Sequence, residues 1–129
     1  MSRIKDLAAE LREEERPLLE RYRELIEAAA TETERRLAQM MYNYQRFQLQ
    51  SLELFQDRVP ERFHCFAVIT HDDVNVRQRP SGKSEAVARL GRGTPVIVMS
   101  FQGFWAEVQL VGGETGYVFK DYVRCEAGA

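Results

Sequence analysis

The stretch from Val74 to Val123 constrains the fold more than any other part of this 129-residue chain. Short apolar runs, such as V-I-V at 96–98 and F-W-A-E-V at 104–108, alternate at close spacing with Gly, Pro, Ser and Asp. Short strands bounded by turn-forming residues are typical of small antiparallel β-barrels. We therefore predict that the C-terminal half of the chain forms such a barrel.

The preceding stretch from Leu18 to Phe55 has a different composition and a different apolar pattern. It contains no Gly and no Pro and is rich in Ala, Leu, Glu, Arg, Gln and Met, which are good helix formers. Apolar residues recur at three- and four-residue steps, which predicts an amphipathic helix with a wide apolar stripe. Because Pro17 lacks an amide donor and clashes with the turn before it, we place a helix break near Glu15–Pro17.

A second break is possible at Thr31, because Thr31 and Glu34 have the spacing of a capping box. With no Gly in this region, we favour a helix that continues through Thr31. An unbroken helix over Leu18–Phe55 would be on the order of 55 Å long, which is longer than a small barrel.

The apolar stripe must then pack on another helix, either in a hairpin of the same chain or in a second chain. We predict coiled-coil-like self-association, most simply as a two-fold dimer, and leave the oligomer order open. The predicted interface consists of the apolar positions Leu18, Tyr22, Leu25, Ile26, Leu37, Met40, Met41, Tyr44 and Phe47.

The chain is therefore predicted to have two parts and an α+β architecture. A helical oligomerisation segment covers residues 1–58 and a barrel covers residues 63–125, with a hinge around Asp57 and Pro60. Alternation along the strands predicts a barrel interior of Val68, Val76, Leu90, Val96, Val98, Val108, Leu110 and Val118.

The order of the pieces in the second half resembles the bacterial SH3 domain family, over about residues 66–124. The family pattern runs approximately L-N-V-R-x-x-P-S, G-x-L-x-x-G-x-x-V, G-W-x-x-V, then G-x-x-G-W-V and Y-L or Y-V. The matching residues are Asn75, Val76, Arg77, Pro80, Ser81, Leu90, Gly93, Val96, Trp105, Val108, Gly113, Gly116, Tyr117, Val118, Tyr122 and Val123. The resemblance implies an SH3-like barrel but names no ligand, because one barrel carries many unrelated sites.

Aromatic residues near the loops that flank the groove of this family are the candidate ligand-binding residues. Flat aromatic grooves recognise extended peptides, so a protein or peptide partner is expected. The alternative is that some of these rings only cover the barrel ends and that the stem of Arg77 packs on one of them. The candidate groove consists of Arg77, Phe101, Phe104, Trp105, Tyr117 and Tyr122.

Two other partners are weighed against a protein or peptide. Many bacterial SH3 domains bind peptidoglycan peptides, so the resemblance also implies a cell-wall module. A cluster of cations between Arg77 and Arg92, which contains Glu85 as its only acidic residue, suggests a nucleic acid as the partner. Neither half of the chain is strongly basic, which makes a nucleic acid the weaker idea. The basic cluster consists of Arg77, Arg79, Lys83, Arg89 and Arg92.

No catalytic constellation is visible in the sequence. His64 and His71 are the only histidines, and no metal-ligand spacing, Gly-rich phosphate loop or G-x-S-x-G motif occurs. We therefore predict a non-enzymatic interaction protein that needs no cofactor and no metal.

Two cysteines, Cys65 and Cys125, lie near the start and the end of the barrel segment. The resemblance implies that the first and last strands are neighbours, so the two thiols can meet. Residues 1–16 are charged throughout and lack the apolar core of a secretory signal, and no apolar run approaches the length of a membrane span. We therefore expect a cytoplasmic protein, provided that no signal was removed, and two reduced thiols.

Overall fold

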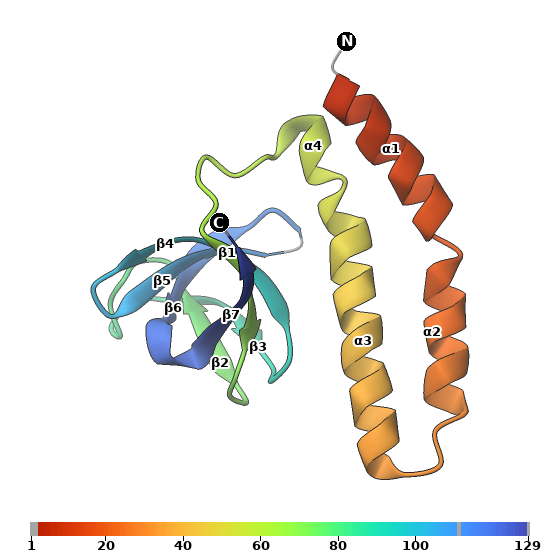
Figure 1. Ribbon diagram of the computed structural model, residues 1–129. Helices are drawn as coiled ribbons and strands as arrows, with labels where there is room; N and C mark the ends of the chain where they lie inside the picture. Colours follow the sequence, from red (N-terminus) through yellow and green to blue (C-terminus); the bar gives the residue numbers. More distant parts are fainter. Residues whose placement is uncertain (1–2, 111, 129) are drawn as a thin grey trace. The chain divides into compact units, whose positions relative to one another are not determined.

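The computed structural model describes residues 3–110 and 112–128 (Figure 1). The chain divides into two compact units, Met1–Val59 and Pro60–Ala129. The first contains helices and the second contains an antiparallel sheet of seven strands, which confirms the predicted α+β architecture.

The helical unit begins with α1 (Arg3–Glu15) and α2 (Leu18–Glu27). They are separated by Arg16 and Pro17, where the break was predicted. The unit continues with α3 (Glu32–Ser51) and ends with the single turn of α4 (Leu54–Asp57). Within the described residues, none of these helices is both long enough and apolar enough to cross a membrane.

The prediction of a helix continuing through Thr31 is wrong, because α2 ends at Glu27 and α3 starts a new direction alongside it (Figure 1). The capping box is formed: the Thr31 hydroxyl accepts from the Glu34 amide at 3.1 Å, and the Glu34 carboxylate accepts from the Thr31 amide at 3.3 Å. The same carboxylate oxygen accepts from the Ala30 amide at 2.7 Å. These bonds satisfy the exposed amides of a new helix start, so the chain reverses without a Gly.

The hairpin of α2 and α3 buries few side chains. No residue of α2 is buried, and α3 buries Ala38, Tyr42, Phe47 and Leu49. Of the nine predicted interface residues, Phe47 is buried at 4% exposure. Tyr22, Ile26 and Tyr44 are half-buried, and the remaining five are 38–61% exposed: Leu18, Leu25, Leu37, Met40 and Met41. The interface itself stays a prediction.

The second unit folds as a small antiparallel barrel in which the strand order is β3-β2-β6-β5-β4-β1-β7. A short turn of 3₁₀ helix at Lys120–Tyr122 leads into the last strand. The strands are β1 (Cys65–Ile69), β2 (Val74–Arg77), β3 (Ala86–Leu90), β4 (Pro95–Gln102), β5 (Trp105–Gln109), β6 (Thr115–Phe119) and β7 (Val123–Gly128).

The barrel core contains most of the predicted interior. Five predicted valines are 0% exposed, namely Val76, Val96, Val98, Val108 and Val118, and Leu90 and Leu110 pack against them. Val68 is the exception: it is 3% exposed but lies outside this core cluster, which takes Cys65, Ala67 and Ile69 instead. Because side chains alternate along a strand, a one-residue error in register moves the whole set to the other face.

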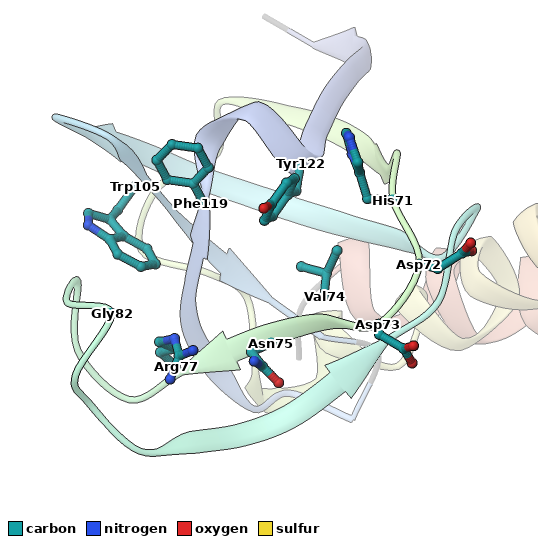
Figure 2. A pocket seen from close by; sticks show the side chains of 10 residues that line it. All are labelled: His71, Asp72, Asp73, Val74, Asn75, Arg77, Gly82, Trp105, Phe119 and Tyr122. Carbon is teal, nitrogen blue, oxygen red and sulfur yellow. The ribbon is translucent and has the colours of Figure 1, made fainter.

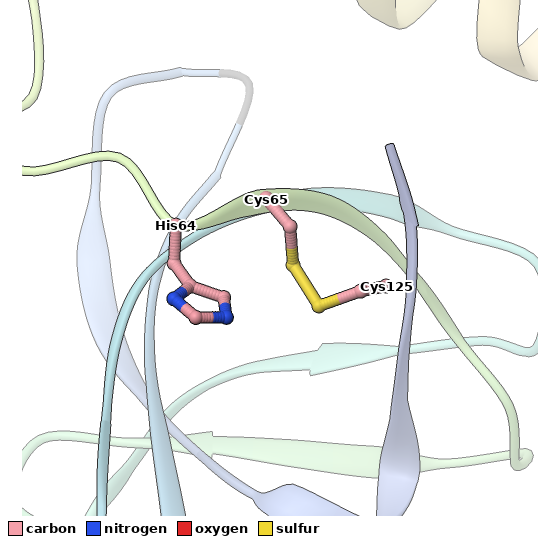
Figure 3. Close-up of side chains that lie close together, drawn as sticks. All are labelled: His64, Cys65 and Cys125. Atoms are coloured by element: carbon pink, nitrogen blue, oxygen red, sulfur yellow. A yellow bond between two sulfur atoms is a disulfide. The ribbon is translucent and has the colours of Figure 1, made fainter. Parts of the chain in front are cut away.

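The prediction of two reduced thiols is wrong, because Cys65 and Cys125 form a disulfide (Figure 3). Strands β1 and β7 pair directly, and a register shift at Phe66/Ala67 places Cys125 opposite Ala67. The Cα atoms of the two cysteines are 5.8 Å apart, a separation that a disulfide spans without moving the backbone. Reduced thiols were expected only because a cytoplasmic location was expected. The pairing of β1 with β7 instead brings the two sulfur atoms together.

Candidate functional site

A pocket of the barrel lies where β2 separates from β6. Strand β2 pairs with β3 along its length, but with β6 it pairs only through Arg77 and Tyr117. Beyond this contact a pocket of about 370 Å³ opens (Figure 2). Its lining residues are His71, Asp72, Asp73, Val74, Asn75, Arg77, Gly82, Trp105, Phe119 and Tyr122.

One wall of the pocket is a chain of aromatic rings. The ring centroids of Trp105 and Phe119 are 6.0 Å apart, those of Phe119 and Tyr122 are 5.5 Å apart, and those of Tyr122 and His71 are 4.7 Å apart. The 3₁₀ turn after β6 places Tyr122 beside Phe119, and the Thr70 amide holds the Tyr122 carbonyl at 2.9 Å. Trp105 is half-buried and Tyr122 is 36% exposed, so both offer apolar surface to a ligand.

The rest of the lining includes a row of three polar residues, Asp73, Asn75 and Arg77. Asn75 and Arg77 alternate with Val74 and Val76, which belong to the barrel core, so these two polar residues lie on the outer face of β2. Asp73 directly precedes the strand, and Figure 2 shows Asn75 between Asp73 and Arg77. Asp73 has a left-handed backbone (φ 53°), which Asp adopts at lower cost than most residues.

Arg77 also holds the loop between β2 and β3. Its Nη1 donates to the Ser84 carbonyl at 2.9 Å. Ser84 is 6% exposed, and its hydroxyl bonds to the Arg79 carbonyl at 2.9 Å and the Ser81 carbonyl at 3.0 Å. The loop is therefore an ordered part of the site, and Arg77 has a structural contact as well as a position in the pocket.

A glycine on β6 permits the contact that positions Arg77. A Cβ atom at Gly116 would lie 2.5 Å from Val76 Cγ1 and 3.0 Å from the Arg77 carbonyl oxygen. Only a residue without a side chain allows the two strands to approach this closely.

The structure brings together three of the six predicted groove residues, Arg77, Trp105 and Tyr122. Phe104 lies beside the pocket, 66% exposed, with Lys120 Nζ 5.4 Å from its ring centroid. Phe101 packs edge-on against His64 at 5.2 Å, outside the pocket, and Tyr117 does not line it.

Phe119, Asp73 and Asn75 are the most informative residues that sequence reasoning missed. Asn75 was visible in the family pattern, and alternation from Arg77 back along the strand would have placed it on the same face. Asp73 precedes the strand, so alternation does not place it. Phe119 ends a strand and carries no pattern of its own, so only its ring contacts reveal its place.

The predicted basic cluster is spread along β2, β3 and their loops. Arg79, Lys83, Arg89 and Arg92 are exposed and Arg77 is half-buried. Arg92 Nε lies 3.6 Å from Asp72 Oδ1, an exposed ion pair of little energetic weight. A nucleic-acid contact through these residues stays a prediction.

His64 lies close to the disulfide (Figure 3). The ring of this exposed histidine and the two sulfur atoms offer ligand atoms within 4.8 Å of one another. Metals bind thiolates, and both sulfur atoms here are held in the disulfide. We therefore assign this group a structural role in joining the first and last strands.

Comparison with known families identifies the fold of the second unit. The family model of the bacterial SH3 domain matches residues 72–124, which contain every pocket residue except His71. No curated protein matches the chain. Domains of this family are typically non-catalytic binding modules. Residues 72–124 of this chain, which follow an N-terminal helical region, are therefore a bacterial SH3 domain.

Proposed function

We propose that this chain is a non-enzymatic interaction protein whose SH3 domain binds an extended peptide in the pocket beside β2. The observation that carries the proposal is the pocket itself, which is lined both by the rings of Trp105, Phe119 and Tyr122 and by the polar row of Asp73, Asn75 and Arg77. An apolar surface with a few convergent polar groups is the usual form of a ligand site. Alternating contacts with rings and polar groups suit an extended peptide.

A displayed random-peptide library, selected on the immobilised full chain, tests this proposal. Tyr122→Ala is expected to weaken the selected peptides about thirtyfold, because truncating an aromatic anchor costs about 2 kcal/mol. Phe101→Ala is the matched control, since Phe101 is 41% exposed and lies outside the pocket. Equal loss in both variants, or none in either, would contradict the proposed site, provided that thermal melting shows both variants folded.

The helical unit is proposed to join copies of the chain. Its support is the number of large apolar side chains that the hairpin leaves exposed, with Leu37 at 61% and Leu25 at 45%. Such apolar surface is costly to leave in water, and a second copy would cover it. Several domains held together would convert weak peptide binding into higher avidity.

Sedimentation of the full chain at micromolar concentration tests the assembly. Leu37→Glu is expected to convert a dimer or larger oligomer to a monomer. Val59→Glu is the control, because Val59 is 59% exposed but lies outside the predicted interface. A wild-type monomer at this concentration would refute self-association.

The disulfide favours a cell-wall peptide as a second candidate ligand. Disulfides persist in oxidising compartments and are rare in the cytosol, so this bond argues against the cytoplasmic location expected from the sequence. Retention on purified peptidoglycan is expected for the wild type and reduced for Tyr122→Ala. Failure of the wild type to be retained would remove this candidate and leave a protein peptide as the ligand.

A further inference from the structure

We infer that the pocket selects a short peptide with both termini free, its amino group at the Asp72 and Asp73 end and its carboxylate at Arg77. This inference rests on the proposed peptide-binding function and adds the ligand's charge, length and direction. It comes from the order of three polar residues that line the pocket, Asp73 just before β2 and Asn75 and Arg77 on it, which read acid, amide and guanidinium.

The two ends of the pocket carry opposite charge. Among the described residues, no acidic side chain pairs with Arg77, whose Nη1 bonds only to the Ser84 carbonyl, and the exposed cations Arg79 and Lys83 follow it. At the other end Asp73 has no ion pair in the described chain, and Asp72 shares one long contact with Arg92 at 3.6 Å. A ligand with an ammonium at one end and a carboxylate at the other meets complementary charge at both.

The length of the polar row sets the length of the ligand. The strand from Val74 to Arg77 spans about 10 Å between its end Cα atoms, and Asp73 adds at most one further step of about 3.8 Å. An extended chain spans about 3.5 Å per residue, so a peptide of three or four residues reaches both ends. The pocket volume of about 370 Å³ suits a ligand of this size.

The middle of the pocket suits a peptide backbone. The Asn75 side chain lies between the two charged ends, and its amide both donates and accepts hydrogen bonds, as a peptide group does. Opposite it, Phe119 and Tyr122 provide apolar surface for ligand side chains. With its amino end at Asp73, the bound peptide runs parallel to β2.

Trialanine and its blocked forms test the inference on the full chain. The four probes are the free peptide, the N-acetyl peptide, the C-terminal amide and the doubly blocked peptide, titrated by NMR with the Trp105 indole as reporter. Each block is expected to weaken binding about tenfold, because each removes one charge-assisted contact.

Protein variants locate each end of the ligand. Asp73→Asn keeps the side-chain shape and tolerates the left-handed backbone, so the fold is preserved. It is expected to abolish the penalty for N-acetylation while the penalty for amidation stays. Asp121→Asn, beside Tyr122 but outside the lining, is expected to change neither. Arg77→Gln is expected to abolish only the amidation penalty, whereas a purely structural Arg77 would weaken all four probes equally.

The outcomes separate this inference from the proposed function. Equal binding of all four probes overturns the inference and leaves peptide binding intact. Binding of library peptides without binding of any trialanine probe also overturns it, because the pocket then takes an internal segment of a chain. Failure of both trialanine and the library removes the proposed function itself. The inference is supported if each block weakens trialanine binding, if Asp73→Asn abolishes only the N-acetylation penalty, and if Arg77→Gln abolishes only the amidation penalty.

Discussion

The barrel and the helical hairpin bury their apolar residues to different extents. Five valines of the barrel core are 0% exposed, and a disulfide joins the first strand to the last. In contrast, α2 has no buried residue, and Leu37 on α3 is 61% exposed. The barrel therefore completes its core within one chain, whereas the hairpin does not.

This difference follows from geometry. A sheet that curls into a barrel surrounds its own interior, so a short segment is enough to exclude water from the alternating valines. Two antiparallel helices form a single layer, and each can turn only part of its wide apolar stripe toward the other. The hairpin therefore leaves large apolar side chains exposed along its helices, while the barrel encloses a core and presents a pocket beside β2.

Removing the disulfide is expected to have the largest effect, and only on the barrel. The bond joins residues separated by 60 positions, and a loop of this length corresponds to about 4 kcal/mol of unfolding free energy. The double variant Cys65→Ala/Cys125→Ala should lose this amount in urea unfolding followed by the fluorescence of Trp105, the only tryptophan. Helical circular dichroism should change little. Reductant should reproduce the loss in the wild type and leave the double variant unaffected.

Gly116→Ala is expected to have the next largest effect, again on the barrel. The new methyl group would meet Val76 and the Arg77 carbonyl, and overpacking of this kind costs about 2 kcal/mol. Trp105 fluorescence during urea unfolding measures the loss. Gly91→Ala is the control, because a Cβ at Gly91 meets nothing within 4 Å. A similar loss of unfolding free energy in both variants would show that the close contact between β6 and β2 is not the cause of the loss.

Dilution should affect only the helical unit if copies associate through it. The unfolding free energy of a dimeric helical unit falls by about 1.4 kcal/mol for each tenfold dilution of the chain. Thermal melts followed by helical circular dichroism should shift with concentration, while those followed by Trp105 fluorescence should not. A helical melt that is independent of concentration would mean that the hairpin is stable alone.

Thr31→Ala is expected to have the smallest effect, confined to the start of α3. Loss of the hydrogen bond from the Glu34 amide costs about 1 kcal/mol, the usual value for a helix cap. The melting of the helical circular dichroism signal measures it. Thr33→Ala, in the first turn of the same helix, is the control and should be neutral or slightly stabilising. Equal behaviour of the two variants would contradict a role for the cap in forming the hairpin.

Sequence reasoning located elements that depend on a few neighbouring residues. It was wrong where two local signals conflicted, as at Thr31 and Val68. The break at Pro17 and most of the barrel interior were predicted because proline chemistry and alternation act over a few residues. The break at Thr31 was visible as T-x-x-E, but the absence of Gly was given more weight than the cap. Val68 was placed in the core because its strand offered apolar residues on both faces.

Local patterns along the chain were sufficient for the α+β architecture, the small barrel and most of its core, and the family resemblance added the SH3 assignment. Periodicity and turn chemistry are properties of neighbouring residues, so they can be read without coordinates. The disulfide, and the pocket that brings Asn75 and Arg77 together with Phe119 and Tyr122, required the assembled sheet. Each depends on which strands lie side by side and where β2 separates from β6, and such contacts between distant segments arise only when the barrel closes.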